Sequence, residues 1–289
     1  MPFIYKEKDL NLVDEALTQG MFTNVVETNN VDWTGARDFR VKDITTSGYQ
    51  YHTRNKGWNP GTVTQTRDTY TLQFDRDIEF FVDVMDVDET DQELAASAIT
   101  GKFIEKQARP EIDAFRFMKM AEAATEDNTI TSETLTAATI FDRLKTMIAP
   151  IRKYGTQNIT AWLSSEAMGL LERSPEWSRN FDVLNSGTAI ETRVTSIDGV
   201  QLMEVWDDDR MFTEFDFTDG FVPTSTAGKI QIMMVARPGI VAKIKHSAIM
   251  LFGVGEHSQG DGWLYQNRMY HDLWRLHQHK GVVIASVKA

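Results

Sequence analysis

The stretch FRVKDITTSGYQYHTRNKGWNPGTVTQTRDTYTLQF, residues 39–74, decides the fold. Two runs rich in Thr, Val and Tyr, residues 39–53 and 62–74, flank the turn-forming residues 54–61. Because β-branched and aromatic residues favour strands and Asn-Pro-Gly favours a turn, the stretch predicts a long β-hairpin. Both faces of its second strand are too polar to bury against a core of their own. A two-stranded ribbon is marginal alone, so we expect it to lean on a neighbouring molecule.

A core strand and a long helix follow the hairpin. Apolar residues alternate from Ile78 to Val84, which predicts a strand with one buried face. The sequence Thr90-Asp91-Gln92-Glu93 has the spacing of a capping box, in which side-chain oxygens accept hydrogen bonds from the free amides at a helix start. A stripe at helical spacing then runs from Leu94 to about Ala124, interrupted at Pro110. If continuous, such a helix is roughly 50 Å long at ~1.5 Å per residue, which suits a spine rather than a compact core.

The rest of the chain alternates between helical and strand patterns, which predicts an α+β fold. The clearest amphipathic helix runs from Ile140 to Ile151, and a short helix begins at Ser164 or Ser165. Strands are expected at residues 158–163, 192–197, 200–205 and 230–235, and the tail 244–287 is mainly β with a Gly-rich loop at 253–262. Residues 1–35 are polar, with scattered large side chains at Leu12, Val13, Phe22 and Trp33. They predict an extended arm whose large side chains dock elsewhere.

Composition and charge exclude several classes of protein. The 289 residues include no Cys, which rules out disulfides and thiolate metal sites and fits a reducing cytosol. The amino terminus is charged where a secretory signal would be apolar. The longest apolar stretch, residues 230–244, is broken by charges, Pro and Gly. We therefore expect a soluble protein without a membrane span. The net charge of −12 argues against a dedicated nucleic-acid reader. Residues 229–289 carry +5 and the remainder −17, which either reflects two solvated surfaces or favours self-association.

Several groups of polar residues could suggest chemistry, and for each we favour a structural explanation. The spacing of His271, His277 and His279 suits neither a helical metal-binding pair nor a zinc finger. The run Asp207–Asp209 lacks the Gly and the downstream Glu of a calcium loop. The acidic series from Asp75 to Glu93 is explained by helix capping and charge complementarity better than by paired carboxylates for hydrolysis.

Motifs for nucleotide binding and acyl transfer are missing from the sequence. Glycines 253, 255, 260 and 262 do not have the dinucleotide-binding spacing, and neither a phosphate-binding loop nor G-x-S-x-G occurs. Lys56, at the predicted hairpin tip, could form a covalent cross-link, but a loop lysine is usually only solvated. We therefore expect no enzymatic activity, catalytic residue, cofactor or metal site.

The order of these parts resembles the tailed-phage major capsid proteins of the Hong Kong 97 type. Local strings carry the resemblance: Tyr70-Thr71-Leu72 with Asp75-Arg76 and the run FVDVMDVDET from Phe81 to Thr90, RPEIDAF from Arg109 to Phe115, and YQNRMYHD from Tyr265 to Asp272. They are similar to capsid proteins of siphophages that infect Gram-positive bacteria, and the similarity covers essentially the whole chain.

The resemblance implies a fold and a set of partners. It implies an N-terminal arm at 1–35, an E-loop hairpin at 36–80, a peripheral domain with a long spine helix at 81–130, an axial α+β domain at 131–240, and a return to the peripheral domain at 241–289. Hexamers and pentamers would close into an icosahedral head around double-stranded DNA, contacted non-specifically, so that the chain resides in the virion capsid and, before assembly, in the host cytoplasm. Portal and decoration proteins are implied partners. Because the hairpin begins too early to leave room for an N-terminal scaffolding region, we expect a separate scaffolding protein, or none.

Seven residues of the hairpin and its exit are predicted to contact neighbouring copies. They are Arg54, Lys56, Trp58, Arg67, Tyr70, Asp75 and Arg76. Two alternatives stay open for the whole chain. An encapsulin-type nanocompartment would share the fold but load protein cargo, whereas a soluble hydrolase would be a monomer or small oligomer with measurable turnover.

Overall fold

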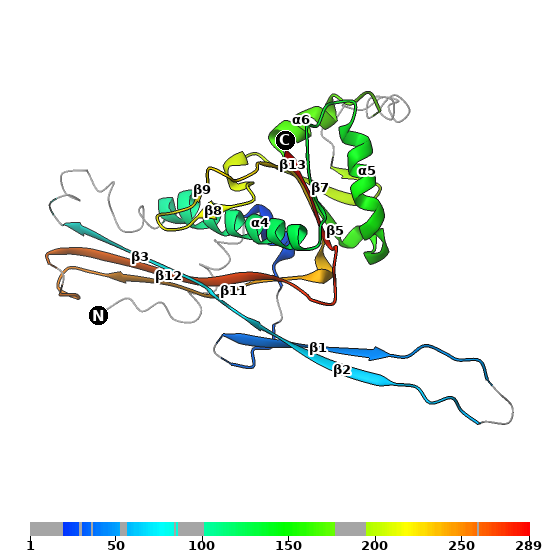
Figure 1. Ribbon diagram of the computed structural model, residues 1–289. Helices are drawn as coiled ribbons and strands as arrows, with labels where there is room; N and C mark the ends of the chain where they lie inside the picture. Colours follow the sequence, from blue (N-terminus) through cyan, green and yellow to red (C-terminus); the bar gives the residue numbers. More distant parts are fainter. Residues whose placement is uncertain are drawn as a thin grey trace, which may run out of the picture.

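Figure 1 shows the computed structural model, which describes residues 20–28, 31–35, 37–52, 57–83, 85, 101–176, 195–258 and 260–289. Two β-sheets lie on either side of a long helix, and a two-stranded ribbon projects from this body (Figure 1). The elements are β1 Asp38–Thr46, β2 Val63–Thr71, β3 Phe74–Asp83, α4 Arg109–Glu126, β4 Ile130–Glu133, α5 Ile140–Ile151, β5 Ile159–Ser164, α6 Ser165–Glu172, β6 Ser196–Ile197, β7 Val200–Val205, β8 Phe215–Asp216, β9 Val222–Pro223, β10 Ile230–Ala236, β11 Ile240–Phe252, β12 Gly262–Arg275 and β13 Val283–Lys288. The expected α+β class is confirmed.

The larger sheet has six strands in the order β4-β13-β10-β5-β7-β6. The last strand of the chain, β13, therefore lies inside the sheet, parallel to β4 and antiparallel to β10. Strands β5 and β10 are buried along their whole length because helices cover both faces of the sheet (Figure 1). This burial explains why their sequences read as continuous apolar runs without alternation.

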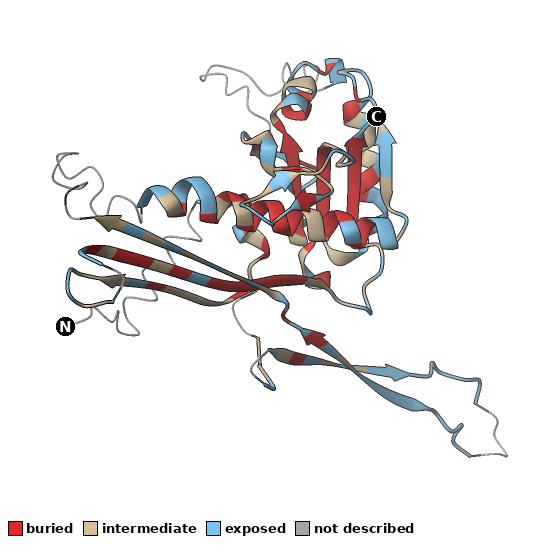
Figure 2. Cartoon of the chain, turned by 60° about the vertical axis from the view of Figure 1, so that its left-hand side comes forward, coloured by how far each residue is buried: buried red, intermediate tan, exposed pale blue. Residues whose placement is uncertain are grey.

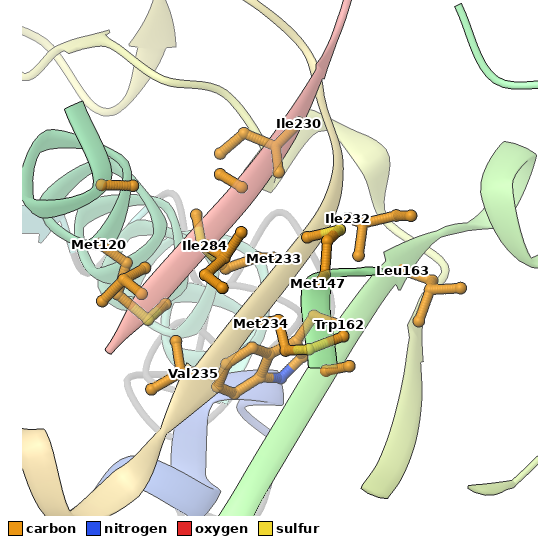
Figure 3. Packing of buried hydrophobic residues seen from close by; sticks show 14 of the residues in the cluster. Met120, Met147, Trp162, Leu163, Ile230, Ile232, Met233, Met234, Val235 and Ile284 are labelled. Carbon is orange, nitrogen blue, oxygen red and sulfur yellow. The ribbon is translucent and has the colours of Figure 1, made fainter. Parts of the chain in front are cut away.

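The main core forms between this sheet and its helices. Figure 3 shows Trp162 of β5 among Met147, Met234 and Val235, all of them buried. The indole Nε1 of Trp162 donates a hydrogen bond to the carbonyl oxygen of Phe22, at 2.9 Å. A large buried aromatic with its polar atom satisfied stabilises the packing without leaving an unpaired donor.

Helix α4 packs against both sheets. Phe117 and Met120 belong to the core of the six-stranded sheet, whereas Ile112 packs with Ile244 and Met269 of the smaller sheet. The expected interruption at Pro110 takes a specific form. A π-helical segment, residues 104–108, leads directly into α4, whose second residue is the proline. Proline removes a hydrogen-bond donor and crowds the preceding turn, and a π-turn accommodates such a mismatch without ending the helix. The predicted capping box at residues 90–93 lies outside the described residues.

The smaller sheet is antiparallel in the order β11-β12-β3. Along β3 the even-numbered residues from Phe74 to Val82 are partly buried, and the odd-numbered ones from Asp75 to Phe81 are exposed. The predicted alternation is therefore confirmed. The expectation that Phe74 ends the hairpin is wrong, because β2 stops at Thr71 and Phe74 begins β3 in a different sheet.

Other boundaries differ in small ways from the predictions. Helix α5 includes Pro150 in its last turn and ends at Ile151. The strand expected at residues 192–197 is described only as β6, since residues 192–194 lie outside the described ranges. Ser164 caps helix α6, accepting a hydrogen bond from the Ala167 amide at 3.2 Å. In the parts of the chain that the structure describes, no helix is long and apolar enough to span a membrane.

Candidate assembly surfaces

The ribbon formed by β1 and β2 is the most exposed part of the described chain. Figure 2 shows it extending from the body with almost its whole length exposed. Large side chains remain in solvent along it, among them Ile44, Tyr49, Tyr51 and Val63, and Trp58 is 94% exposed. Beyond Ser47 and Thr62 the strand pairing stops, and the arms border an open space of about 930 Å³, across which the Asn59 side chain donates to the Tyr51 carbonyl oxygen at 2.9 Å. Exposed apolar residues gathered in one place mark a binding surface.

One face of this ribbon is cationic. The antiparallel register places Lys42 directly opposite Arg67, and Arg40 lies on the same face toward the root. Ile44 and Val63, both exposed, continue this face toward the tip. None of the three cations has an ion-pair partner within the described ranges. We call these five residues the cationic face.

The root of the ribbon is anchored by aromatic packing. Phe39 and Tyr70 stack at 5.2 Å between ring centroids, and Trp274 of β12 meets Phe39 edge-on at 4.9 Å. The Tyr70 hydroxyl accepts a hydrogen bond from the His277 amide at 2.9 Å. Burial raises the pKa of Tyr70, so the hydroxyl stays neutral. The ribbon therefore leaves the body in a fixed direction.

The two residues that join β2 to β3 are also held in place. Leu72 is buried, and its carbonyl oxygen accepts a hydrogen bond from the Tyr270 hydroxyl at 2.8 Å. The Gln73 amide donates to Oδ2 of Asp272 at 3.0 Å. Burial raises the pKa of Asp272, while the amides of Gln73 and Leu273 lower it in part. These hydrogen bonds to β12 fix the point at which the chain leaves the ribbon and enters the smaller sheet.

Asp75 and Arg76, at the start of β3, point to opposite faces of the smaller sheet. Asp75 pairs with Arg268 on the exposed face, where Nε of Arg268 lies 2.9 Å from Oδ1. On the inner face Nε of Arg76 lies 2.8 Å from Oε1 of Glu111 in α4, and the same guanidinium donates to the carbonyl oxygen of Phe217. Burial raises the pKa of Glu111, and the Arg76 guanidinium opposes this shift. Arg76 thereby ties β3 to α4 and to the loop after β8.

Residues 20–28, which we call the strap, cross α4 and are held by buried charges. Asp113 accepts hydrogen bonds from the amides of Phe22 and Thr23, both at 3.0 Å, and Arg210 donates to it at 3.1 Å. Arg116, fully buried, pairs with Glu27. Phe22 itself is buried, so the described part of the predicted arm packs on its own chain rather than waiting for another molecule.

His271 is a buried histidine without hydrogen-bond partners on its ring. Its ring lies 5.1 Å from that of Phe74 in β3 and 5.1 Å from that of Phe115 in α4. Burial, together with the nearby positive charges of Arg116 and Arg76, lowers its pKa to about 3. The ring is therefore neutral at ordinary pH and acts as part of an aromatic cluster.

His277, His279, Asp207 and Asp208 have structural partners. His277 contacts the Tyr70 ring and His279 the Tyr154 ring, whereas His271 packs against Phe74 and Phe115. Asp207 pairs with Arg210 at 2.7 Å and Asp208 with Lys229 at 2.9 Å. Within the described ranges no three His or acidic side chains gather in a way that could hold a metal ion.

The seven predicted contact residues divide into three groups. Arg54 and Lys56 lie outside the described residues, while Trp58 and Arg67 are exposed on the ribbon. Tyr70, Asp75 and Arg76 make the contacts within the chain described above. Their role between copies stays a prediction. Ile44, Tyr49 and Val63 were not among the predicted contact residues, although a large apolar side chain in a strand too polar for a core was the signal for them.

The arrangement of the parts matches solved structures, although no protein-family model and no curated protein sequence matches the chain. The mature capsid of bacteriophage PhiM1 superposes with a TM-score of 0.68 at 11% identity, covering 93% of this chain and 87% of that one. A structure of Gordonia phage Cozz gives a TM-score of 0.61 at 11% identity, over 93% and 86%.

The chain has the Hong Kong 97-type capsid fold. We use the terms of this fold for the matching parts of the chain: E-loop for β1 and β2, spine helix for α4 with the preceding π-turn, and axial sheet for the six-stranded sheet. A virus-like particle from Pyrococcus furiosus also superposes, with a TM-score of 0.51 at 9% identity over 98% of this chain and 99% of that one.

Proposed function

We propose that the chain is the major capsid protein of a tailed bacteriophage. It assembles as hexamers and pentamers into an icosahedral head that encloses double-stranded DNA. The observation that carries the proposal is the E-loop, which is anchored firmly at its root and yet exposes Ile44, Tyr49, Trp58 and Val63 along its length. A segment with a fixed direction and an unburied apolar surface is suited to lie over a neighbouring copy.

The buried charges support a structural rather than an enzymatic role. Glu111 is engaged by Arg76 and Asp113 by Arg210, so these carboxylates hold elements together. The soluble-hydrolase alternative therefore gains no support from the described residues. Many weak contacts summed over a closed lattice would stabilise the shell without any single strong interface.

Negative-stain electron microscopy of the expressed protein, alone and with its phage's scaffolding protein, tests the proposal. Closed shells are expected. A chain that stays monomeric at high concentration under both conditions contradicts it. Deletion of residues 54–61 should leave a folded subunit, by circular dichroism, that assembles poorly, because the E-loop tip is lost. Normal shells from this deletion would show that the E-loop assignment is wrong.

An encapsulin-type nanocompartment is the second candidate, favoured by the superposition on the Pyrococcus furiosus virus-like particle. The lower TM-score of that match, 0.51 against 0.68 for the PhiM1 capsid, places it second. Mass spectrometry of purified shells separates the two, since a nanocompartment would contain an enzyme cargo. In the capsid case the partners would be portal and decoration proteins, a scaffolding protein that acts in the host cytoplasm, and packaged DNA.

A further inference from the structure

The loop that carries β8 and β9, residues 213–227, is acidic and contains no Lys or Arg. Its carboxylates are Glu214, Asp216 and Asp219. The hydroxyls of Thr224 and Thr226 both donate to Glu214 at 2.9 Å, which fixes its direction. Hydrogen bonds from the Thr218 hydroxyl and amide lower the pKa of Asp216. The loop therefore presents to solvent a Glu214 carboxylate of fixed direction and an Asp216 carboxylate whose ionised form is stabilised.

This loop also offers apolar surface. Val222 at the start of β9 is 57% exposed. Asp219 borders a cleft of about 450 Å³ against the smaller sheet and the spine helix, with Phe80 and Phe103 among its lining residues and Asp77 at its edge. Arg76, the cation of that cleft, is already paired with Glu111. We call the loop and this cleft together the acidic surface.

The cationic face of the E-loop has the complementary properties. Lys42 and Arg67 face each other across the two strands, and like charges in directly opposed positions destabilise a sheet. Within the described ranges no carboxylate pairs with either of them. Ile44 and Val63 add apolar area next to the charges. An acidic partner with a small apolar contact would relieve the repulsion and bury the exposed side chains.

The two surfaces lie on different parts of the chain. The E-loop extends away from the body, while β8 and β9 lie on the body beside α4 (Figures 1 and 2). We propose that the cationic face of one copy docks on the acidic surface of the next copy, an inference that rests on the proposed capsid function. A contact between two different patches is head-to-tail, and such contacts close into rings when the rotation fits.

Charge exchange between the two surfaces tests this contact. The double substitution Lys42→Glu with Arg67→Glu, and separately Glu214→Lys with Asp216→Lys, should each raise the protein concentration needed for shell formation at least about tenfold, because each places like charges together. The combination of all four substitutions should return the concentration needed for shell formation to within about threefold of that for the parent chain. The matched control is Asp43→Lys with Asp68→Lys on the opposite face of the same ribbon, which should change it by no more than about twofold.

Cross-linking provides a second measurement that does not depend on altered charges. The chain has no Cys, so only introduced thiols can react. Gln65→Cys lies on the cationic face and Ser225→Cys on the acidic loop, and both positions are exposed. In assembled shells a short bismaleimide should join copies of this double variant into ladders. Thr66→Cys with Ser225→Cys, on the opposite face of the same strand, should give none.

The outcomes separate this contact from the function on which it rests. Two results would overturn the contact and leave the capsid proposal standing. In the first, shells form normally but copies are not cross-linked between Gln65→Cys and Ser225→Cys. In the second, the assembly defects of the two charge-reversed variants add up in the combined variant instead of cancelling. Reversal of the cationic face that leaves shell formation unchanged but lowers DNA retention overturns the contact too, because the face would then bind packaged DNA. If the parent chain forms no shells with any assembly factor, the capsid proposal fails and this contact fails with it.

Discussion

The E-loop and the axial sheet are both made of β-strands, yet the axial sheet buries most of its residues and the E-loop exposes most of its own. All seven residues of β10 are buried, whereas in β2 only Tyr70, next to the root, is buried. Figure 2 shows this contrast within one chain. Burial of apolar area is the main source of folding stability, so the axial sheet stabilises the subunit, whereas the exposed E-loop contributes little to that stability. Stability and assembly should therefore respond to different substitutions.

A pair of tryptophans gives the largest expected contrast. Trp162→Ala removes a fully buried side chain from the axial core and should lower the free energy of unfolding by about 3–5 kcal/mol. Trp58→Ala on the E-loop should change it by less than about 0.5 kcal/mol. Urea unfolding of the unassembled subunit measures both. Equal losses for the two variants would remove the distinction between the regions.

The buried charges of the strap should have the next largest effect. Asp113→Ala leaves two strap amides without their acceptor and removes one of the two carboxylates that pair with Arg210, so it should destabilise the subunit by about 3 kcal/mol. Asp43→Ala, on the ribbon, serves as the control and should lie within about 0.5 kcal/mol of the parent. Thermal unfolding of the two variants compares them directly. A neutral Asp113→Ala variant would show that the strap contributes no stability.

The neutral His271 ring should make the body sensitive to acid. Its folded pKa of about 3 lies below the ordinary value of 6.5, so below pH 6.5 the unfolded chain takes up a proton that the folded chain does not. This contribution to stability is intact above pH 6.5 and is lost progressively as the pH falls toward 3. Between pH 7 and pH 5 the loss should be about 2 kcal/mol.

The His271→Leu variant isolates this contribution. Its free energy of unfolding should fall less steeply between pH 7 and pH 5 than that of the parent chain, while His279→Gln should keep the parent slope. Both slopes are obtained from urea titrations at several pH values. Identical slopes for the parent and His271→Leu would mean that the ring is protonated or solvated in the folded state.

The smallest effect on stability is expected at Val63. Val63→Ser replaces a side chain that is 71% exposed, so the free energy of unfolding should change by less than about 0.5 kcal/mol. Shell formation should nevertheless weaken, since the cationic face loses apolar area. Light scattering during assembly detects this. Unchanged assembly would show that the apolar side chain of Val63 adds nothing to the proposed contact, which would then depend on the charges alone.

Local patterns predicted much of the fold, because their causes are local. Strand β7 was predicted within its observed bounds, Val200–Val205, and the alternation of β3 located its buried face. The end of the hairpin was misplaced because Tyr70, Leu72 and Phe74 keep the same alternation across a change of sheet. Nothing in the local sequence shows that change, which depends on Tyr270 and Asp272, about 200 residues away.

Long-range polar contacts could not be predicted for the same reason. Asp113 accepts hydrogen bonds from residues about 90 positions earlier in the chain. In a single sequence it is one carboxylate among 42 acidic residues. The cationic face depends on the register of the hairpin in the same way. The predicted turn at residues 54–61 would have placed Lys42 opposite Gln73, whereas the observed register places it opposite Arg67.

The place of β13 between β4 and β10 has a consequence for protein synthesis. The sheet cannot be completed until the six-residue strand Val283–Lys288, made about 150 residues after β4, has left the ribosome. A prematurely terminated chain leaves β4 without a neighbour and one edge of β10 open, which exposes unfinished strands to aggregation and degradation. The topology thus excludes chains that are truncated before β13 from the pool of correctly folded subunits.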